Sequence, residues 1–345
     1  VAIGIKLNTN LENNGEPPTY PEKAKMVLIN ECAADAWTPL PTEMEIIANP
    51  KVALRQMIDC AKTMLKQRPN RQAWLSRLAP ARAAYEAGAR ASAEEVRGNK
   101  PIHGFWLAHE IAEFLDPNAT VIFDAFGGSA HLTGRLKARF AGQVLDVGEA
   151  GGVGHGIGMG IGAQCARPGK QVFVMMGDAG IGLGGMDIET AVRYKLPIVY
   201  AIYNNSTWMG GFEDLYAKGQ IHSWHMMQDI RYDKMFEPLG CHVENVTEPD
   251  QIRHALDRAF NSGKTAVVNF IVDRRVPHPW HLSAGTRSNA LRWLDINKVP
   301  DDDLKELLLK GPTPEVEEAL MKKGYPRLQP KGKVSRGEGS ARRGG

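Results

Sequence analysis

A carboxylate and a carboxamide stand at the ends of two apolar segments of the chain, 27 positions apart. Asp178 follows the run QVFVMMG, and Asn205 ends the run PIVYAIYNN. Both side chains offer hard oxygen ligands of the kind that Mg²⁺ prefers, and Mg²⁺ often completes its octahedral shell with phosphate oxygens. Gly177, Gly180 and Gly182 surround the acid, so a diphosphate could approach the backbone amides there. The pair predicts a magnesium and diphosphate site; a tight turn after each strand is the structural alternative.

The elements around these two residues predict that their side chains meet. The apolar segments at 171–178 and 198–205 are expected to be strands, and MDIETAVRYKL between them is expected to be a helix. Such a crossover pairs its strands in parallel, so both polar ends emerge at the carboxyl edge of one sheet, where open α/β sheets bind ligands.

Further strands and helices alternate on both sides of this unit. Strands are expected at 120–124 and 266–273, and helices at 102–115 and 250–261. Alternation of this kind predicts the α/β class with a doubly wound parallel sheet.

The stretch from Gly177 to Asn205 resembles the thiamin-diphosphate signature of the acetolactate-synthase-like enzymes, which starts with GDG or GDx and ends in NN. The resemblance implies a thiamin-diphosphate-binding fold in which Asp178, Asn205 and the main-chain carbonyl of Thr207 bind Mg²⁺. The cofactor-binding residues that it implies are Gly151, Val153, Gly177, Asp178, Ala179, Gly180, Asn205, Thr207, Trp208 and Met209.

A glycine-rich run, GGVGHGIGMGIGA at 151–163, resembles a second motif of the same family. Val153 stands where the family has the residue that wedges the cofactor into a bent conformation. The glycine density is similar to that of oxalyl-CoA decarboxylase and 2-hydroxyacyl-CoA lyase, whereas pyruvate decarboxylases usually have proline at the position of Gly158. The run therefore favours the members of the family that cleave acyl-CoA substrates.

Glu213 is the carboxylate that follows the metal motif, in the segment STWMGGFE. In the family this loop passes beside the thiazolium ring of the cofactor. Glu213 is therefore a candidate acid/base or substrate-orienting group. A surface glutamate at the start of a helix, EDLYAKG, is the alternative.

The chain is predicted to contain four parts. Residues 1–80 resemble the C-terminal part of the family's Rossmann-like central domain, 81–100 form a linker, and 101–275 form the diphosphate and magnesium domain. Residues 276–345 form either a lid over the active site or an arm for subunit packing. The chain begins inside an apolar strand, which suggests the carboxyl part of a longer polypeptide or a subunit completed in trans.

Composition restricts the other functions of the chain. With 345 residues and 43% hydrophobic content, the chain can bury one large or two ordinary cores. Its net charge of +3 gives no sign of a nucleic-acid-binding surface. The four cysteines lack C-x-x-C spacing and indicate reduced thiols. We find no apolar run long enough to span a membrane, so a cytoplasmic location is expected.

The resemblance implies a carbon–carbon lyase that cleaves a 2-hydroxyacyl-CoA to formyl-CoA and an aldehyde or ketone. Alternatives are an oxalyl-CoA decarboxylase, another 2-oxo-acid decarboxylase or acetolactate-type synthase, and a non-catalytic structural subunit. In the family, a glutamate of a separate pyrimidine-binding domain bonds to the cofactor ring, and nothing in this sequence matches that domain. The expected partners are an acyl-CoA substrate, a chain or domain that supplies the missing glutamate, and further subunits of a homo- or hetero-oligomer.

Overall fold

The computed structural model describes residues 1–5, 24–36, 41–67, 69–125, 128–148, 151–208, 230–274, 276 and 322–323. Within them, six strands form one sheet in the order β5-β4-β6-β7-β9-β8, and every neighbouring pair is parallel. The central strands β6 and β7 are buried along their whole length, as expected for strands covered on both faces. The predicted doubly wound parallel sheet is therefore confirmed.

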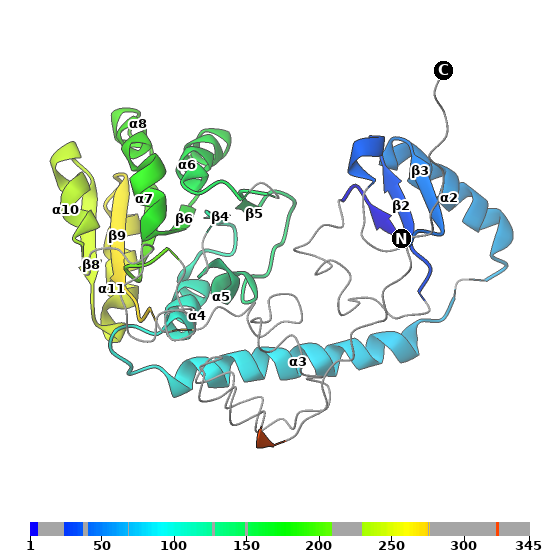
Figure 1. Ribbon diagram of the computed structural model, residues 1–345, viewed down its shortest axis with the longest axis horizontal. Coiled ribbons are helices and arrows are strands. Elements are labelled where there is room, and N and C mark those ends of the chain that lie inside the picture. Colours follow the sequence, from blue (N-terminus) through cyan, green and yellow to red (C-terminus); the bar gives the residue numbers. More distant parts are fainter. Residues whose placement is uncertain are drawn as a thin grey trace. The chain divides into compact units, whose positions relative to one another are not determined.

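Helices cover both faces of this sheet (Figure 1). One core lies between the sheet and α6, α7, α8 and α10, and the other lies between the sheet and α4, α5 and α11. The elements of this domain are α4 (Gly104–Phe114), β4 (Thr120–Phe123), α5 (Ser129–Thr133), β5 (Val144–Asp146), α6 (His155–Ala166), β6 (Val172–Gly177), α7 (Asp178–Gly184), η3 (Gly185–Asp187), α8 (Ile188–Arg193), β7 (Ile198–Asn204), α10 (Tyr232–Phe236), η4 (Glu237–Leu239), β8 (His242–Val246), η5 (Pro249–Gln251), α11 (Ile252–Asn261) and β9 (Ala266–Ile271).

The chain order of the strands places a topological switch point between β4 and β6. From β4 the chain moves outward to β5, then returns to the other side of β4 to form β6 and continues to β7. Because the connections leave β4 and β6 in opposite directions, a crevice opens at their carboxyl ends, where open α/β sheets bind ligands. Asp124 and Asp178 directly follow these two strands.

Two features of the sheet differ from the sequence prediction. The helix expected over MDIETAVRYKL begins earlier, at Asp178, and runs as three short helical segments, α7, η3 and α8. Strands β5 and β8 were not anticipated. Both lie at edges of the sheet, and the half-buried sequence HVENV of β8 lacks the continuous apolar run of a central strand.

A smaller parallel sheet, in the order β1-β2-β3, precedes this domain. Its elements are β1 (Ala2–Ile3), β2 (Val27–Asn30), η2 (Ala33–Asp35), β3 (Met44–Ile47) and α2 (Pro50–Met64). Strand β1 is assigned only at Ala2–Ile3, and residues 6–7 of the apolar sequence AIGIKL lie outside the described residues. Apolar side chains of α2 are exposed, including Leu54 (37%) and Ile58 (46%), so these side chains line no core of the described residues.

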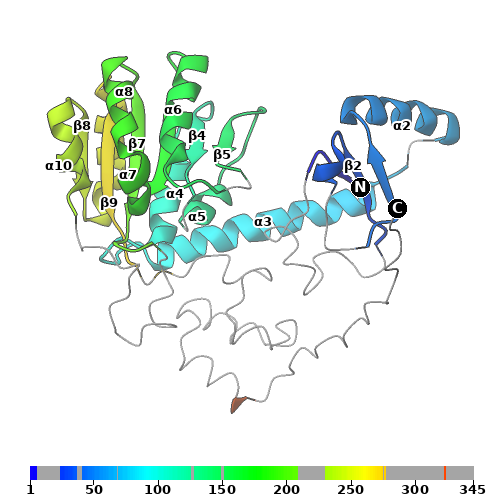
Figure 2. The ribbon, with the colours of Figure 1, turned by 45° about the horizontal axis from the view of Figure 1, so that its top comes forward.

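Helix α3 (Gln72–Glu95) is one continuous helix in both views (Figures 1 and 2). It runs across residue 81, where the sequence predicts that a linker begins. Only its last turns reach the large domain's core, where Ala93 is fully buried. The predicted domain boundaries stay predictions.

The start of α4 depends on an uncharged histidine. His103 caps the helix, because its Nδ1 accepts a hydrogen bond of 3.1 Å from the amide of Phe105. Burial lowers the pKa of His103 to about 4, and the nearby Asp273 only partly opposes this. Protonation would charge a buried ring and would also convert the accepting nitrogen into a donor.

We therefore predict that stability falls as pH drops from 6.5 to about 4, because the unfolded chain binds a proton at His103 that the folded chain does not. The loss is at most about 3 kcal/mol, from about 1.4 kcal/mol for each pKa unit. Urea unfolding across this range measures it. His103→Asn keeps a capping oxygen without the titration, so that variant should show a flatter pH dependence. An unchanged slope would assign the acid sensitivity to other groups.

Candidate functional site

Asp178 lies directly after β6, at the carboxyl edge of the sheet, with a side chain that is only 2% exposed. Its carboxylate accepts backbone hydrogen bonds, among them one from the amide of Ser206 at 2.6 Å and one from the amide of Ala179 at 2.9 Å. Burial nevertheless raises the pKa of Asp178 to about 7, because these bonds offset only part of the cost of desolvating the charge. Within the described part of the chain, no ion pair is found for this buried carboxylate.

The turn after β7 lies beside this carboxylate. Gly177 pairs with Tyr203 in the parallel register of β6 and β7, so Asp178 and Asn205 follow neighbouring strand ends at one edge. Ser206 adopts a left-handed φ of 56°, which is strained for a residue with a side chain, and this aims its amide at Asp178. Asn205 is half-buried and Thr207 is buried in the same turn. The structure therefore brings Asp178 together with the Asn205–Thr207 turn.

These residues fit a magnesium ion. The donor set that the resemblance implies comprises a carboxylate, the carboxamide of Asn205 and the carbonyl of Thr207, all hard oxygens of the kind that suits Mg²⁺. A cation beside Asp178 would favour the charged form that burial disfavours. The described residues contain no group of three or more histidine, cysteine or acidic side chains that could bind a metal, so a site here relies on neutral oxygens and added ligands.

Asp124 is a functional candidate that the sequence reasoning left unused. It follows β4, is 2% exposed, and its two carboxylate oxygens accept the amides of Gly154 at 2.8 Å and Gly156 at 3.0 Å. Gly154 has a φ of 86°, which glycine tolerates and other residues avoid. Asp124 therefore fixes the glycine-rich turn at the start of α6, across the switch point from Asp178. Its position at the end of a predicted strand is the sequence feature that could have identified it.

The glycines of the site close a tight contact between α6 and α7. A Cβ on Gly184 would lie 2.5 Å from the carbonyl oxygen of Gly154, and a Cβ on Gly180 would lie 2.6 Å from Oδ2 of Asp124. The amides of Gly154 and Gly156 already donate to Asp124, so they are not free for a phosphate. At these positions the glycine-rich pattern thus serves close packing.

Asparagines join three neighbouring strands near the same edge. Asn204 Nδ2 donates to Asn269 Oδ1 at 3.1 Å, and Asn269 Nδ2 donates to Asn245 Oδ1 at 2.8 Å. Both Asn204 and Asn269 also donate to the carbonyl of Ile230, at 3.0 and 3.2 Å. This row of amides, which we call the asparagine ladder, fixes Ile230 against the strand that carries Asn205.

The remaining predicted site residues lie in the turn before α6 and in the segment after Thr207. Gly151 is exposed and Val153 is half-buried in the turn before α6, while Trp208 is 48% exposed after the Asn205–Thr207 turn. Met209 and Glu213 lie outside the described residues. Among the described residues of this group, Gly151, Val153 and Trp208, no hydrogen bond to the Asp178 carboxylate is found.

The switch point, the buried Asp178 and the oxygen-rich turn define an open α/β sheet with polar groups gathered at its ligand-binding edge. The family model described as "Thiamine pyrophosphate enzyme, C-terminal TPP binding domain" matches residues 127–270. Thiamine pyrophosphate is another name for thiamin diphosphate. Residues 127–270 are thus similar to this C-terminal domain, which agrees with the resemblance found in the sequence.

Three curated relatives illustrate the range of the similarity. The chain is 34% identical over 214 residues to a probable acetolactate synthase of Mycobacterium bovis, which covers 60% of this chain and 38% of that protein. It is 34% identical over 205 residues to oxalyl-CoA decarboxylase of Escherichia coli, covering 59% and 32%. It is 27% identical over 297 residues to 2-hydroxyacyl-CoA lyase of Oryza sativa, covering 79% and 48%. The chain therefore spans half or less of the length of these relatives.

The cysteines and the described helices also bear on the sequence predictions. All four cysteines are free, as the sequence predicted. Among the described helices, none combines the length and apolar character needed to cross a membrane.

Proposed function

We propose that this chain is the cofactor-binding part of a carbon–carbon lyase that cleaves a 2-hydroxyacyl-CoA to formyl-CoA and an aldehyde or ketone. The buried Asp178 beside the Asn205–Thr207 turn carries the proposal, because that arrangement suits a magnesium-bound diphosphate. The similarity to a 2-hydroxyacyl-CoA lyase favours this substrate class, since it extends over 79% of the chain and beyond the matched domain.

In this proposal, each described residue of the site has a separate task. Asp178 supplies the charge that holds Mg²⁺, and Asn205 and the Thr207 carbonyl complete the protein's share of the ligands. Asp124 keeps the start of α6 in place across the crevice. Bound thiamin diphosphate would supply the electron sink that cleavage of a carbon–carbon bond requires. A pyrimidine-binding domain, from another chain or another segment, would complete the site in an oligomer.

The substrate class is tested by incubating the complete assembly, loaded with thiamin diphosphate and Mg²⁺, with a 2-hydroxyacyl-CoA, with oxalyl-CoA and with pyruvate. Formyl-CoA release from the hydroxyacyl substrate is the expected result. Activity on pyruvate alone would instead favour an acetolactate-type synthase, the second candidate, which the 34% identity over 214 residues supports. Calorimetry that detects no cofactor binding, even with the partner chain present, would favour a structural subunit.

Glu213 is proposed as an acid/base or substrate-orienting group of the assembled site. Glu213→Gln removes the proton-transferring carboxylate but keeps the shape, so turnover should fall by about 100-fold while the cofactor stays bound. Steady-state kinetics and calorimetry on the same preparation separate the two effects. Glu237→Gln changes an exposed glutamate on η4 and is the matched control. Parent-like turnover in Glu213→Gln would return this residue to an ordinary surface role.

A further inference from the structure

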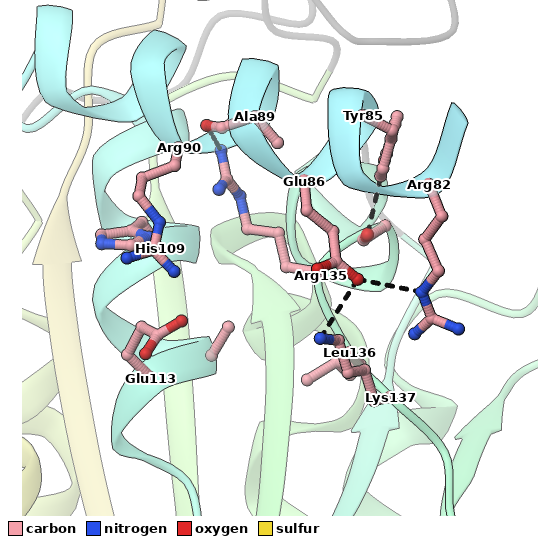
Figure 3. Close-up of a pocket in the computed structure, with 12 residues that line it drawn as sticks. Arg82, Tyr85, Glu86, Ala89, Arg90, His109, Glu113, Arg135, Leu136 and Lys137 are labelled. Atoms are coloured by element: carbon pink, nitrogen blue, oxygen red, sulfur yellow. Dashed lines mark hydrogen bonds and ion pairs between the residues drawn. The ribbon is translucent and has the colours of Figure 1, made fainter. Parts of the chain in front are cut away.

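A pocket of about 280 Å³ lies between α3, α4 and the residues that follow α5 (Figure 3). It shares no lining residue with the Asp178 site. Four cationic side chains and two carboxylates line it, together with a histidine and a smaller apolar portion. The charged and histidine members are Arg82, Arg90, Arg135, Lys137, Glu86, Glu113 and His109.

Two of the four cations already share one carboxylate. Glu86 of α3 forms ion pairs with Arg82, at 3.0 Å, and with Lys137, at 3.1 Å, and this pairing lowers the pKa of Glu86. Figure 3 shows these three side chains together at one side of the pocket. A ligand therefore meets the remaining cations.

Of these remaining cations, Arg135 is the one whose charge is partly removed from water. Its guanidinium is half-buried and donates through Nη2 to the carbonyl of Ala89 at 2.9 Å. No carboxylate of the described residues lies within ion-pair distance of it, although Glu113 is close enough to favour its charge. Burial lowers the pKa of Arg135, which reports the cost of removing this charge from water. Arginine carries five donors and stays protonated in proteins, so the cost is relieved by an anion rather than by loss of a proton.

Arg90 and His109 also line the pocket. Figure 3 shows the Arg90 side chain extending from α3 to His109 on α4. Burial lowers the pKa of His109, and Arg135 and Arg90 lower it further, so the histidine is neutral near pH 7. No ion pair is found for Arg90 within the described residues. With the histidine neutral, four cations against two carboxylates leave an excess of two positive charges in the pocket.

We propose that this pocket binds a small organic phosphate monoester. A phosphate monoester carries close to two negative charges at neutral pH, which matches the excess. Arginine forks suit its oxygens because they can donate two parallel hydrogen bonds. Ala89, Ala112 and Leu136 offer an apolar wall for the organic part, and the volume approaches the roughly 300 Å³ at which small-molecule sites begin.

The test is titration calorimetry on the full chain with two probes, glycerol 3-phosphate and adenosine 3′,5′-bisphosphate, the nucleotide end of coenzyme A. EDTA in the buffer removes Mg²⁺ and so disables metal-dependent binding at Asp178. We expect saturable binding of one molecule per chain, weakened at least about tenfold in Arg135→Gln and in Arg90→Gln. Arg90 is exposed, so its variant keeps the fold even if Arg135→Gln does not.

Arg193→Gln is the matched control, because Arg193 is exposed on α8 and pairs with Glu189 at 3.0 Å. It should bind both probes like the parent. Tighter binding of the bisphosphate would assign the pocket to a coenzyme A ester, and equal or tighter binding of glycerol 3-phosphate would assign it to a free phosphorylated metabolite; both uphold the site. No saturable binding of either probe, or binding unchanged in both pocket variants, would overturn it.

Discussion

Replacing Asp178 with alanine should abolish the Mg²⁺-dependent retention of thiamin diphosphate by this chain. Asp178 is the charged member of the candidate ligand set, and the neutral oxygens of Asn205 and Thr207 bind Mg²⁺ weakly without it. Changes to residues that only support a metal ligand already cost 10- to 100-fold in affinity, so the loss of the ligand itself should exceed about 100-fold. Calorimetry with thiamin diphosphate in the presence of Mg²⁺ measures the loss.

The pH dependence of the same titration provides a second readout. With its pKa raised to about 7, Asp178 is increasingly protonated below neutral pH in the metal-free protein. Because a metal binds the deprotonated carboxylate, the parent's apparent affinity should fall about tenfold for each pH unit below 7. Asp187→Ala removes an exposed acid of η3 and should leave both readouts unchanged. Full retention of cofactor by Asp178→Ala would contradict the assigned ligand and the proposed function with it.

Replacing Asp124 should disturb the site from the opposite side of the crevice. Asp124→Ala leaves the amides of Gly154 and Gly156 without their acceptors, and hydrogen bonds to charged groups contribute about 1.5–3 kcal/mol each. We expect the variant to lose about 3 kcal/mol or more of the free energy of unfolding. Asp124→Asn keeps one accepting oxygen and should lose less, so cofactor binding can be measured on it. Its affinity for thiamin diphosphate should be about tenfold weaker if the turn before α6 contacts the cofactor.

Asp146 is a well-matched control for this prediction. It is the last residue of the neighbouring strand β5 and accepts a hydrogen bond of 2.7 Å from the amide of Gly148, but its side chain is exposed. Asp146→Asn should therefore change stability by less than about 0.5 kcal/mol. Urea unfolding of Asp124→Ala, Asp124→Asn and Asp146→Asn measures the free energy of unfolding that each variant loses. Equal losses for Asp124→Asn and Asp146→Asn would mean that burial of Asp124 has no special role.

The sheet and the main site residues were accessible from the sequence for a clear physical reason. Strands β6 and β7 are buried on both faces, so their sequences are continuous apolar runs, and each run ends in a polar residue at the ligand edge. The parallel crossover then places Asp178 and the turn that holds Asn205 at the same edge, where the Ser206 amide donates to Asp178. The edge strand β8, with the polar sequence HVENV, gives no comparable signal.

The parts that escaped prediction depend on contacts between segments that are distant in the chain. Asp124 accepts amides 30 and 32 residues away, and Arg135 lies beside Ala89 of α3, 46 residues earlier. The asparagine ladder joins residues up to 65 positions apart. Local periodicity carries no information on such pairs. The glycine-rich run was informative about the family, but it gave no sign that Gly154 and Gly156 donate to a carboxylate of the protein itself.

The position of β9 has a consequence for biosynthesis. This strand is the last of the described strands, yet it lies inside the sheet between β7 and β8, and Ile102 forms backbone hydrogen bonds with Ile271 and Asp273, on either side of Val272. A ribosome-bound chain that ends before residue 266 therefore exposes the unpaired edges of two strands, which are prone to wrong pairing. The domain closes only when its last strand leaves the exit tunnel, so nascent chains of this protein should depend on chaperones until translation has passed that point.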